Sequence, residues 1–250
     1  MIKPKRHNLF ITSLQRNGAK AYNTTNETGS FSVNLAAQIN SKKVKDIRLI
    51  SAQIPVSNYN VTSSNNIVPI NDGSNKTVTI TPGSYTAIQL ALAIQTALNS
   101  SSSGWTCTYN ANTYKITISG TATFVLRFGT VTTNSIARTI GFSNTDITFG
   151  SAATGESAVK LNFSNYFIVC PELGFTTELV ASNSSLAVAF VIPIDKNTGD
   201  ILNYMPDEQQ QINGSKLIPN ELNISLFSDN FTLVDLNNAD WSFVISFEEI

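Results

Sequence analysis

Residues 81–100 read TPGSYTAIQLALAIQTALNS, and this stretch decides how the rest of the chain is interpreted. Thr86 and Gln89 have the spacing of a capping box, in which each side chain bonds the backbone N–H of the other residue at a helix start. Leu90, Ile94 and Leu98 follow at four-residue intervals and form one apolar stripe. The sequence therefore predicts an amphipathic helix that lies on a sheet.

On both sides of this helix the chain consists of short apolar runs separated by Asn, Gly, Ser and Pro, a pattern typical of antiparallel strands. The early runs are HNLFITSLQ, GSFSVNL and VKDIRLISAQIP, and the late runs are SNYFIVCPELG, SLAVAFVIPID, NELNISLFS, FTLVDLN and DWSFVISFEEI. In the last run Trp241, Phe243, Ile245 and Phe247 alternate onto one face, which predicts core. The flanking strands number about eight, as a jelly roll of two packed sheets requires.

The middle of the chain has a different texture. KTVTI, the helix, WTCTYN, TYKITISG and TFVLRF follow one another, and SIARTIGF then predicts a short helical turn. This order is typical of an α+β unit. The predicted fold is mainly β: a single jelly-roll β-sandwich with an inserted small α+β subdomain containing the one long helix. The predicted bounds are 1–74 and 151–250 for the jelly roll and 75–150 for the insertion.

The composition limits the classes of partner. Only 13% of the 250 residues are charged and the net charge is −1, whereas average domains carry about 25% charged residues. The surface must therefore consist mostly of Asn, Ser and Thr, which do not attract nucleic acid over long range. No apolar run has the length of a membrane span, and the first residues do not have the pattern of a signal peptide.

The first residues, MIKPKRHN, are the exception to this neutrality. They concentrate Lys3, Lys5, Arg6 and His7 in one short segment. One interpretation is a solvated chain end. The other is an arm that docks on an acidic neighbour or on packaged nucleic acid.

Residues for chemistry are few. His7 is the single histidine, and no His/Cys set has metal-ligand spacing. In DKNTGD, Asp195, Asn197 and Asp200 offer oxygen ligands for calcium, but the spacing is wrong for an EF-hand and a turn between strands is favoured. We therefore expect no enzyme, no cofactor and no catalytic, cofactor-binding or metal residue. The enzymatic alternative is a carboxylate-pair hydrolase that would use Asp195, Asp200, Asp207 or Glu208.

The cysteines and aromatic residues allow two further interpretations each. Cys107 and Cys170 lie in strand-like runs and are expected to be buried thiols, with a disulfide as the alternative. A carbohydrate-binding sandwich would need exposed aromatic residues in a planar row, whereas the candidates are scattered and one of them, Trp105, is expected to pack on the helix; the candidates are Tyr59, Trp105, Tyr109 and Tyr114.

Three passages together resemble a known family. They are VKDIRLISAQIPVSNYNV, then ITPGSYTAIQLALAIQTALN with SIARTIGF, and the ending NISLFSDNFTLVDLNNADWSFVISFEEI. This combination resembles the penton and related minor capsid proteins of icosahedral double-stranded DNA viruses, including virophages and large eukaryotic DNA viruses.

The resemblance implies a structural role and no catalytic residue. It implies a single jelly roll at the fivefold vertex of the virion, a homopentamer as the assembly, and contacts with the double-jelly-roll major capsid protein and other minor capsid proteins. It implies no small-molecule substrate; contact of the basic arm with nucleic acid is a minor alternative. Other functions left open are a different minor capsid position, a receptor-binding spike and a carbohydrate-binding module.

Overall fold

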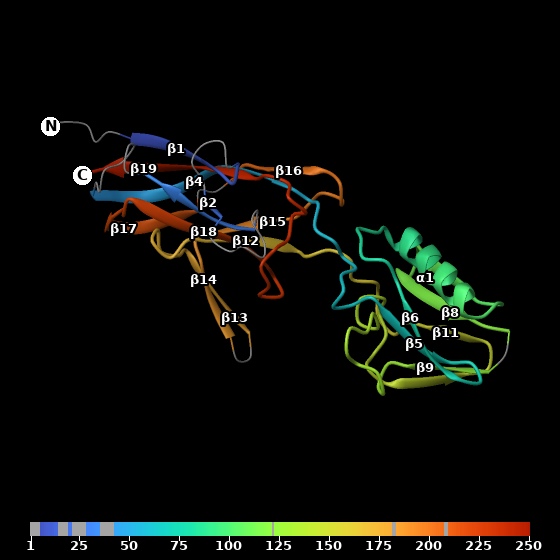
Figure 1. Cartoon of the computed structure of the whole chain (residues 1–250). Helices are drawn as coiled ribbons and strands as arrows, with labels where there is room; N and C mark the ends of the chain where they lie inside the picture. Colours follow the sequence, from blue (N-terminus) through green and yellow to red (C-terminus); the bar gives the residue numbers. More distant parts are fainter. Residues whose placement is uncertain are drawn as a thin grey trace. The chain divides into compact units, whose positions relative to one another are not determined.

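The computed structural model describes residues 6–14, 20–21, 29–35, 43–121, 123–181, 184–207 and 210–250. Contacts divide the chain into two compact units (Figure 1). One unit comprises Met1–Asn58 together with Phe163–Ile250, and the other comprises Tyr59–Asn162. Each unit has a hydrophobic core of its own. Because the first unit is discontinuous in sequence, the second is an insertion into it.

The first unit contains two antiparallel sheets of five strands each. One sheet is formed by β1 (Arg6–Thr12), β4 (Lys43–Pro55), β16 (Ile201–Tyr204), β17 (Gln211–Leu217) and β19 (Ser242–Glu249). The other is formed by β2 (Lys20–Ala21), β3 (Ser30–Asn34), β12 (Asn165–Val169), β15 (Phe190–Pro193) and β18 (Glu221–Ser228). A separate hairpin of β13 (Thr177–Ala181) and β14 (Ser184–Val188) extends from this unit (Figure 1).

The strand order of the two sheets is that of a jelly roll. The sheets have the orders β1-β19-β4-β16, with β17 also on β4, and β15-β12-β18-β3-β2. The first long strand therefore pairs with the last, β3 pairs with β18, β4 pairs with β16 and β17, and β12 pairs with β15. Strands near the N-terminus thus pair with strands near the C-terminus, and the paired strands are divided between two sheets. This arrangement is the double Greek key of a jelly roll. The predicted fold class is confirmed.

Alternation of side chains along the strands builds the core between the two sheets. In β18 every second residue is buried, and β19 carries Trp241 at its entrance and Phe243, Ile245 and Phe247 along it, all less than 5% exposed. Trp241 packs edge-on against Phe31 of β3, with ring centroids 5.5 Å apart. The prediction that the C-terminal run is core is confirmed, and it joins the first and last parts of the chain.

The insertion leaves and re-enters the jelly roll at one place. Asn58 follows β4, and its side-chain oxygen accepts a hydrogen bond of 2.8 Å from the hydroxyl of Tyr166 in β12. Both side chains are buried. Since β4 and β12 are consecutive strands of the jelly roll, the bond joins the two connections to the insertion at their base.

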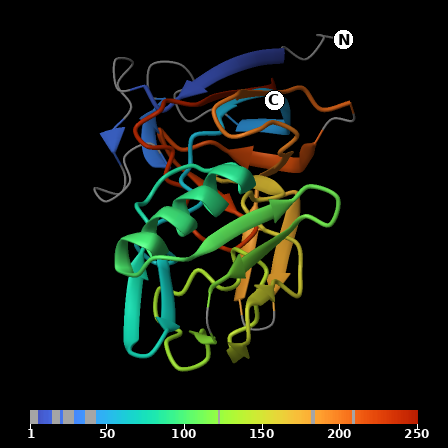
Figure 2. The ribbon, with the colours of Figure 1, turned by 90° about the vertical axis from the view of Figure 1, so that its right-hand side faces the viewer.

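The inserted unit contains one helix and two small antiparallel sheets. The helix is α1 (Ala87–Ser101). One sheet has the order β10-β9-β5-β6, formed by β5 (Ile67–Asn71), β6 (Asn75–Thr79), β9 (Phe124–Arg127) and β10 (Asp146–Phe149). The other has the order β11-β8-β7, formed by β7 (Thr106–Asn110), β8 (Lys115–Ser119) and β11 (Ala152–Thr154). Figure 2 shows α1 on one face of this unit, between the hairpin of β5 and β6 and the hairpin of β7 and β8.

The predicted helix and its cap are confirmed. Thr86 is the N-cap, its hydroxyl accepts from the backbone N–H of Gln89, and the side chain of Gln89 accepts from the N–H of Thr86. Leu90, Ile94 and Leu98 are fully buried and share a core with β6, β8 and β9. The SIARTIGF segment forms hydrogen-bonded turns at this core, in which the N–H of Ile140 reaches the carbonyls of Ile136 and Ala137.

The inserted unit is longer at both ends than the predicted range 75–150. It begins at Tyr59 because β5 pairs with β6 and β9 and buries Val68 and Ile70 in the second core. It continues to Asn162 because β11 pairs with β8 and buries Ala153 in the same core. Apolar strands next to a boundary fit the pattern of either unit, and only their pairing partners assign them.

We predict that Leu98→Ala lowers the free energy of unfolding of the inserted unit by about 2–5 kcal/mol, because it removes apolar contacts from a closed core. The measurement is hydrogen exchange at the backbone amides of α1 in increasing denaturant, because tryptophan fluorescence would combine Trp105 with Trp241 of the jelly roll. Leu92→Ala is the matched control on the same helix: Leu92 is 60% exposed, and its change should stay within about 0.5 kcal/mol. Equal effects at the two positions would contradict the packing described for α1.

We also predict that the jelly roll folds without the insertion. Joining Asn58 to Phe163 by a short Gly/Ser linker should give a cooperatively unfolding β protein, because closing a short loop costs little and the first core keeps all of its strands. Thermal unfolding by circular dichroism measures this. A matched deletion of residues 75–150 should aggregate more readily than the first variant, since it leaves the apolar strands β5 and β11 in the connection without their partners. Failure of the first variant to unfold cooperatively would show that the two units fold as one.

Candidate interaction surfaces

The basic residues of the N-terminus that the structure describes lie in a strand. Arg6 and His7 belong to β1 and face Glu248 and Phe247 across the β1–β19 pair. Glu248 is only 8% exposed. Its Oε1 lies 2.9 Å from Nζ of Lys45, and its Oε2 lies 3.9 Å from a guanidinium nitrogen of Arg6. The hydrogen bond to Glu248 raises the pKa of Lys45 above its ordinary value.

His7 is held by the same strand pair. Its ring stacks on Phe247 at a centroid distance of 5.6 Å, and Nε2 lies 3.0 Å from Oε2 of Glu249. The side chains of Arg6 and His7 are thus directed at carboxylates of β19. A basic arm that reaches a neighbour would consist of Lys3 and Lys5, which lie outside the described residues.

The acidic residues weighed for calcium or hydrolysis do not form a site in the described part of the chain. DKNTGD is a turn between β15 and β16: the N–H of Asn197 donates to Oδ2 of Asp200, the N–H of Asp200 donates to the carbonyl of Asn197, and Gly199 has a φ of +96°. Asp207 is exposed, and Glu208 lies outside the described residues. Within the described ranges no group of three His, Cys, Asp or Glu side chains could hold a metal ion.

The cysteine and tyrosine groups of the cores are inert. Cys107 is a free thiol in the inserted unit and Cys170 is a free thiol in the jelly roll, and both are buried. Burial raises the pKa of Cys107 to about 12 and also raises the pKa of Cys170 and of Tyr166. A thiol that stays protonated at neutral pH is a poor nucleophile.

The described helix is not long and apolar enough to span a membrane.

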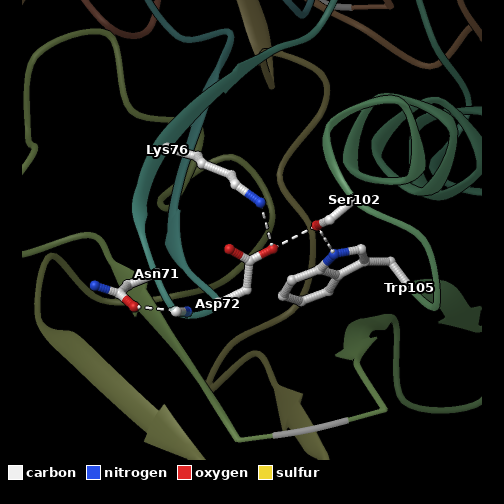
Figure 3. Close-up of polar contacts among 6 residues, drawn as sticks. Asn71, Asp72, Lys76, Ser102 and Trp105 are labelled. Atoms are coloured by element: carbon white, nitrogen blue, oxygen red, sulfur yellow. Dashed lines mark hydrogen bonds and ion pairs between the residues drawn. The ribbon is translucent and has the colours of Figure 1, made fainter.

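A polar network joins the end of α1 to the turn between β5 and β6 (Figure 3). Oδ2 of Asp72 accepts from Nζ of Lys76 at 2.9 Å and from the hydroxyl of Ser102, the C-cap residue of α1. The Ser102 oxygen in turn accepts from the indole N–H of Trp105 at 3.0 Å. The network fixes Trp105, which is 5% exposed and packs edge-on against Phe124 rather than on a ligand surface.

This network makes the inserted unit sensitive to acid. The hydrogen bond from Ser102, more than any other interaction, lowers the pKa of Asp72 below its ordinary value, and Lys76 adds to this against the effect of burial. A carboxylate with a lowered pKa in the folded state stabilises the fold above its unfolded pKa of about 4, and the stabilisation is lost as the pH falls through the folded pKa.

We therefore predict that Asp72→Asn destabilises the inserted unit at pH 7 and reduces its loss of stability below about pH 4. Chemical denaturation at a series of pH values measures both effects. Asp195→Asn is the control, because Asp195 lies in an exposed turn of the other unit. An unchanged acid profile in Asp72→Asn would show that other carboxylates set the acid sensitivity.

The outer face of α1 is unusual for a solvent-facing helix. The helix carries no charged residue in its 15 positions. Ile88 and Leu92, one turn apart, are 67% and 60% exposed. Beside this face lies an open groove of about 590 Å³ between the helix and the end of β6, lined by Thr79, Ile80, Thr81, Ser84, Tyr85, Gln89, Leu92, Ala93, Thr96 and Ala97. None of these lining residues carries a formal charge at pH 7.

The sequence contains a signal for this surface, which lies outside the stripe of Leu90, Ile94 and Leu98. Ile88 and Leu92 interrupt the polar side of the helix that Leu90, Ile94 and Leu98 define as buried. A helix that is apolar on more than one face usually has a second contact. Exposure of both residues in the folded unit identifies the outer face as a candidate interaction surface.

Comparison with known proteins finds similarity to solved structures only. No family model matches the chain, and no curated protein matches it. Among solved structures, the chain is similar to the selenomethionine-labelled mavirus penton protein, at 11% sequence identity and a TM-score of 0.49, over 98% of this chain and 100% of that chain.

Proposed function

We propose that this chain is a structural protein of an icosahedral viral capsid, and that it is the penton protein, which closes the fivefold vertices as a homopentamer. The observation that carries the proposal is the jelly-roll strand order of the first unit, with a separate unit inserted between β4 and β12. A jelly roll is a common subunit of viral shells. In this proposal the jelly roll forms the shell contacts, and the inserted unit, Tyr59–Asn162, has a separate role.

The character of the surface supports a role in assembly. A ring contact is heterologous: one side of a subunit meets a different side of the next, and closure depends on the rotation between copies. The subunit faces that meet in such a ring lose their bound water on assembly. Each charged group buried there without a good partner costs several kcal/mol of desolvation free energy. A chain with only 13% charged residues largely avoids that cost.

The proposed partners follow from this role. The chain would contact itself within the ring and the double-jelly-roll major capsid protein around it, and its place would be the vertex of the virion. No substrate or cofactor is part of this function.

The test is the assembly state of the full chain. We expect purified protein at high concentration to form rings with fivefold symmetry in negative-stain images and a pentamer mass in analytical ultracentrifugation. Shells assembled from the major capsid protein should close their vertices only when this chain is present. A protein that stays monomeric, together with shells that close without it, would refute the vertex role.

We further propose that Lys3 and Lys5 contact the surrounding shell protein. Deleting residues 1–5 should leave the ring intact and weaken incorporation into shells, most strongly at low ionic strength, because salt screens exposed charges beyond about 8–10 Å. The deletion stops before Arg6, since Arg6 and His7 pair with β19. Lys3→Gln/Lys5→Gln is the matched variant that removes charge and keeps length. Loss of the ring in either variant would place the segment in the pentamer's own interface.

A further inference from the structure

The inserted unit has a strand edge without a partner. β6 is the last strand of its sheet and pairs only with β5 in the described part of the chain. The N–H of Ile80 bonds the carbonyl of Asn66 on the β5 side. Since backbone groups alternate in direction along an antiparallel strand, the N–H and C=O groups of Thr77 and Thr79 point away from β5. No described residue bonds these groups.

The corresponding edge on the other side of α1 is closed. Oε1 of Gln95 accepts the backbone N–H of Cys107 in β7 at 2.9 Å. The side chain of Asn99 bonds both backbone groups of Trp105, accepting from its N–H at 3.0 Å and donating to its carbonyl at 2.8 Å. The helix thus supplies side-chain partners to the edge of β7 and supplies none to the edge of β6, within the described residues.

The edge of β6 also lacks the usual protection. Natural edge strands often carry an outward lysine that prevents pairing with another chain. The lysine of β6 is Lys76, and its Nζ is turned to Asp72 in the network of Figure 3. The outward residues of the strand are the uncharged Asn75, Thr77 and Thr79, which are exposed.

The uncharged groove begins where this edge ends. Thr79 and Thr81 line it on the strand side, and Leu92 and Ala93 line it on the helix side. Tyr85 closes one part, with its hydroxyl donating to the carbonyl of Thr81 at 2.7 Å. Backbone donors and acceptors at strand spacing, next to an apolar helix face, match the main chain and alternate side chains of an extended peptide.

We propose that the inserted unit binds an extended, uncharged polypeptide segment of a partner protein, which adds a strand to the free edge of β6 and lays alternate side chains in the groove beside α1. A main chain satisfies the groups of Thr77 and Thr79 at the spacing that the strand imposes. A charged segment would lose water against a lining that offers no counter-charge, which disfavours it. The site does not depend on ring formation by the jelly roll.

The experiment selects short random peptides from a displayed library on the full-length protein. The selected peptides are expected to be low in charge and to slow hydrogen exchange at the amides of Thr77 and Thr79. Thr79→Pro removes an outward N–H without removing a hydrogen bond to β5, and should weaken binding of a selected peptide about tenfold or more. Thr79→Val changes the same side chain but keeps the N–H, and it should bind the selected peptide more tightly than Thr79→Pro does.

A second pair of variants tests the groove independently of the backbone. Leu92→Glu places a charge in the lining and should weaken binding by a similar factor. Ser100→Glu lies two turns further along the same helix, is exposed and stands outside the lining, and should leave the affinity unchanged. Unfolding curves of all four variants establish that each is folded.

Three results would overturn the proposal. The first is a selection that enriches no peptide, and the second is a set of peptides that bind Thr79→Pro and Leu92→Glu as well as they bind the unchanged protein. The third is binding of neutral oligosaccharides on a glycan array that is lost in Leu92→Glu, in the absence of peptide binding. That result would assign the groove to a saccharide in place of a polypeptide.

Discussion

The jelly roll depends on the pairing of β4 with strands that arrive last in the chain. β4 spans Lys43–Pro55 and lies beside β19 on one side and β16 and β17 on the other. All three partners come after residue 200, so the sheet cannot form until almost the whole chain is present. Contacts between such distant residues cost loop entropy before they stabilise the fold, which makes folding of this topology slow.

The same constraint explains where the insertion is tolerated. The chain passes from one sheet to the other between β4 and β12, and the buried bond between Asn58 and Tyr166 holds the two connections together. With the ends fixed side by side, the length of chain between them changes the closure entropy only slowly. A unit of 104 residues, from Tyr59 to Asn162, therefore replaces what would otherwise be a loop.

The two units differ in the surfaces that they present. The jelly roll presents the outer faces of two five-stranded sheets. The inserted unit keeps a separate core, closes one of its strand edges with Gln95 and Asn99, and leaves β6 open beside an uncharged groove. An open edge is a liability for aggregation, so its persistence in this unit is best explained by a partner that covers it.

Much of this architecture follows from the order of residues alone. Local signals determined the helix at residues 87–101, through the capping box of Thr86 and Gln89 and the stripe of Leu90, Ile94 and Leu98. Alternation determined that DWSFVISFEEI is a core strand. These features depend on neighbours three or four residues apart, or on every second residue, and a sequence contains such information directly.

The partners of the strands were decided only by the tertiary structure. The sequence of β5 fits a strand of the jelly roll as well as a strand of the insertion. Its pairing with β6 and β9 assigns it to the insertion. The basic residues Arg6 and His7 resemble a free arm in the sequence, yet the register of β1 on β19 brings them to Glu248 and Glu249. The free edge of β6 is likewise invisible in its own residues. It exists because α1 directs its amide side chains to β7, and the direction of a side chain across a fold is a property of packing that no local pattern encodes.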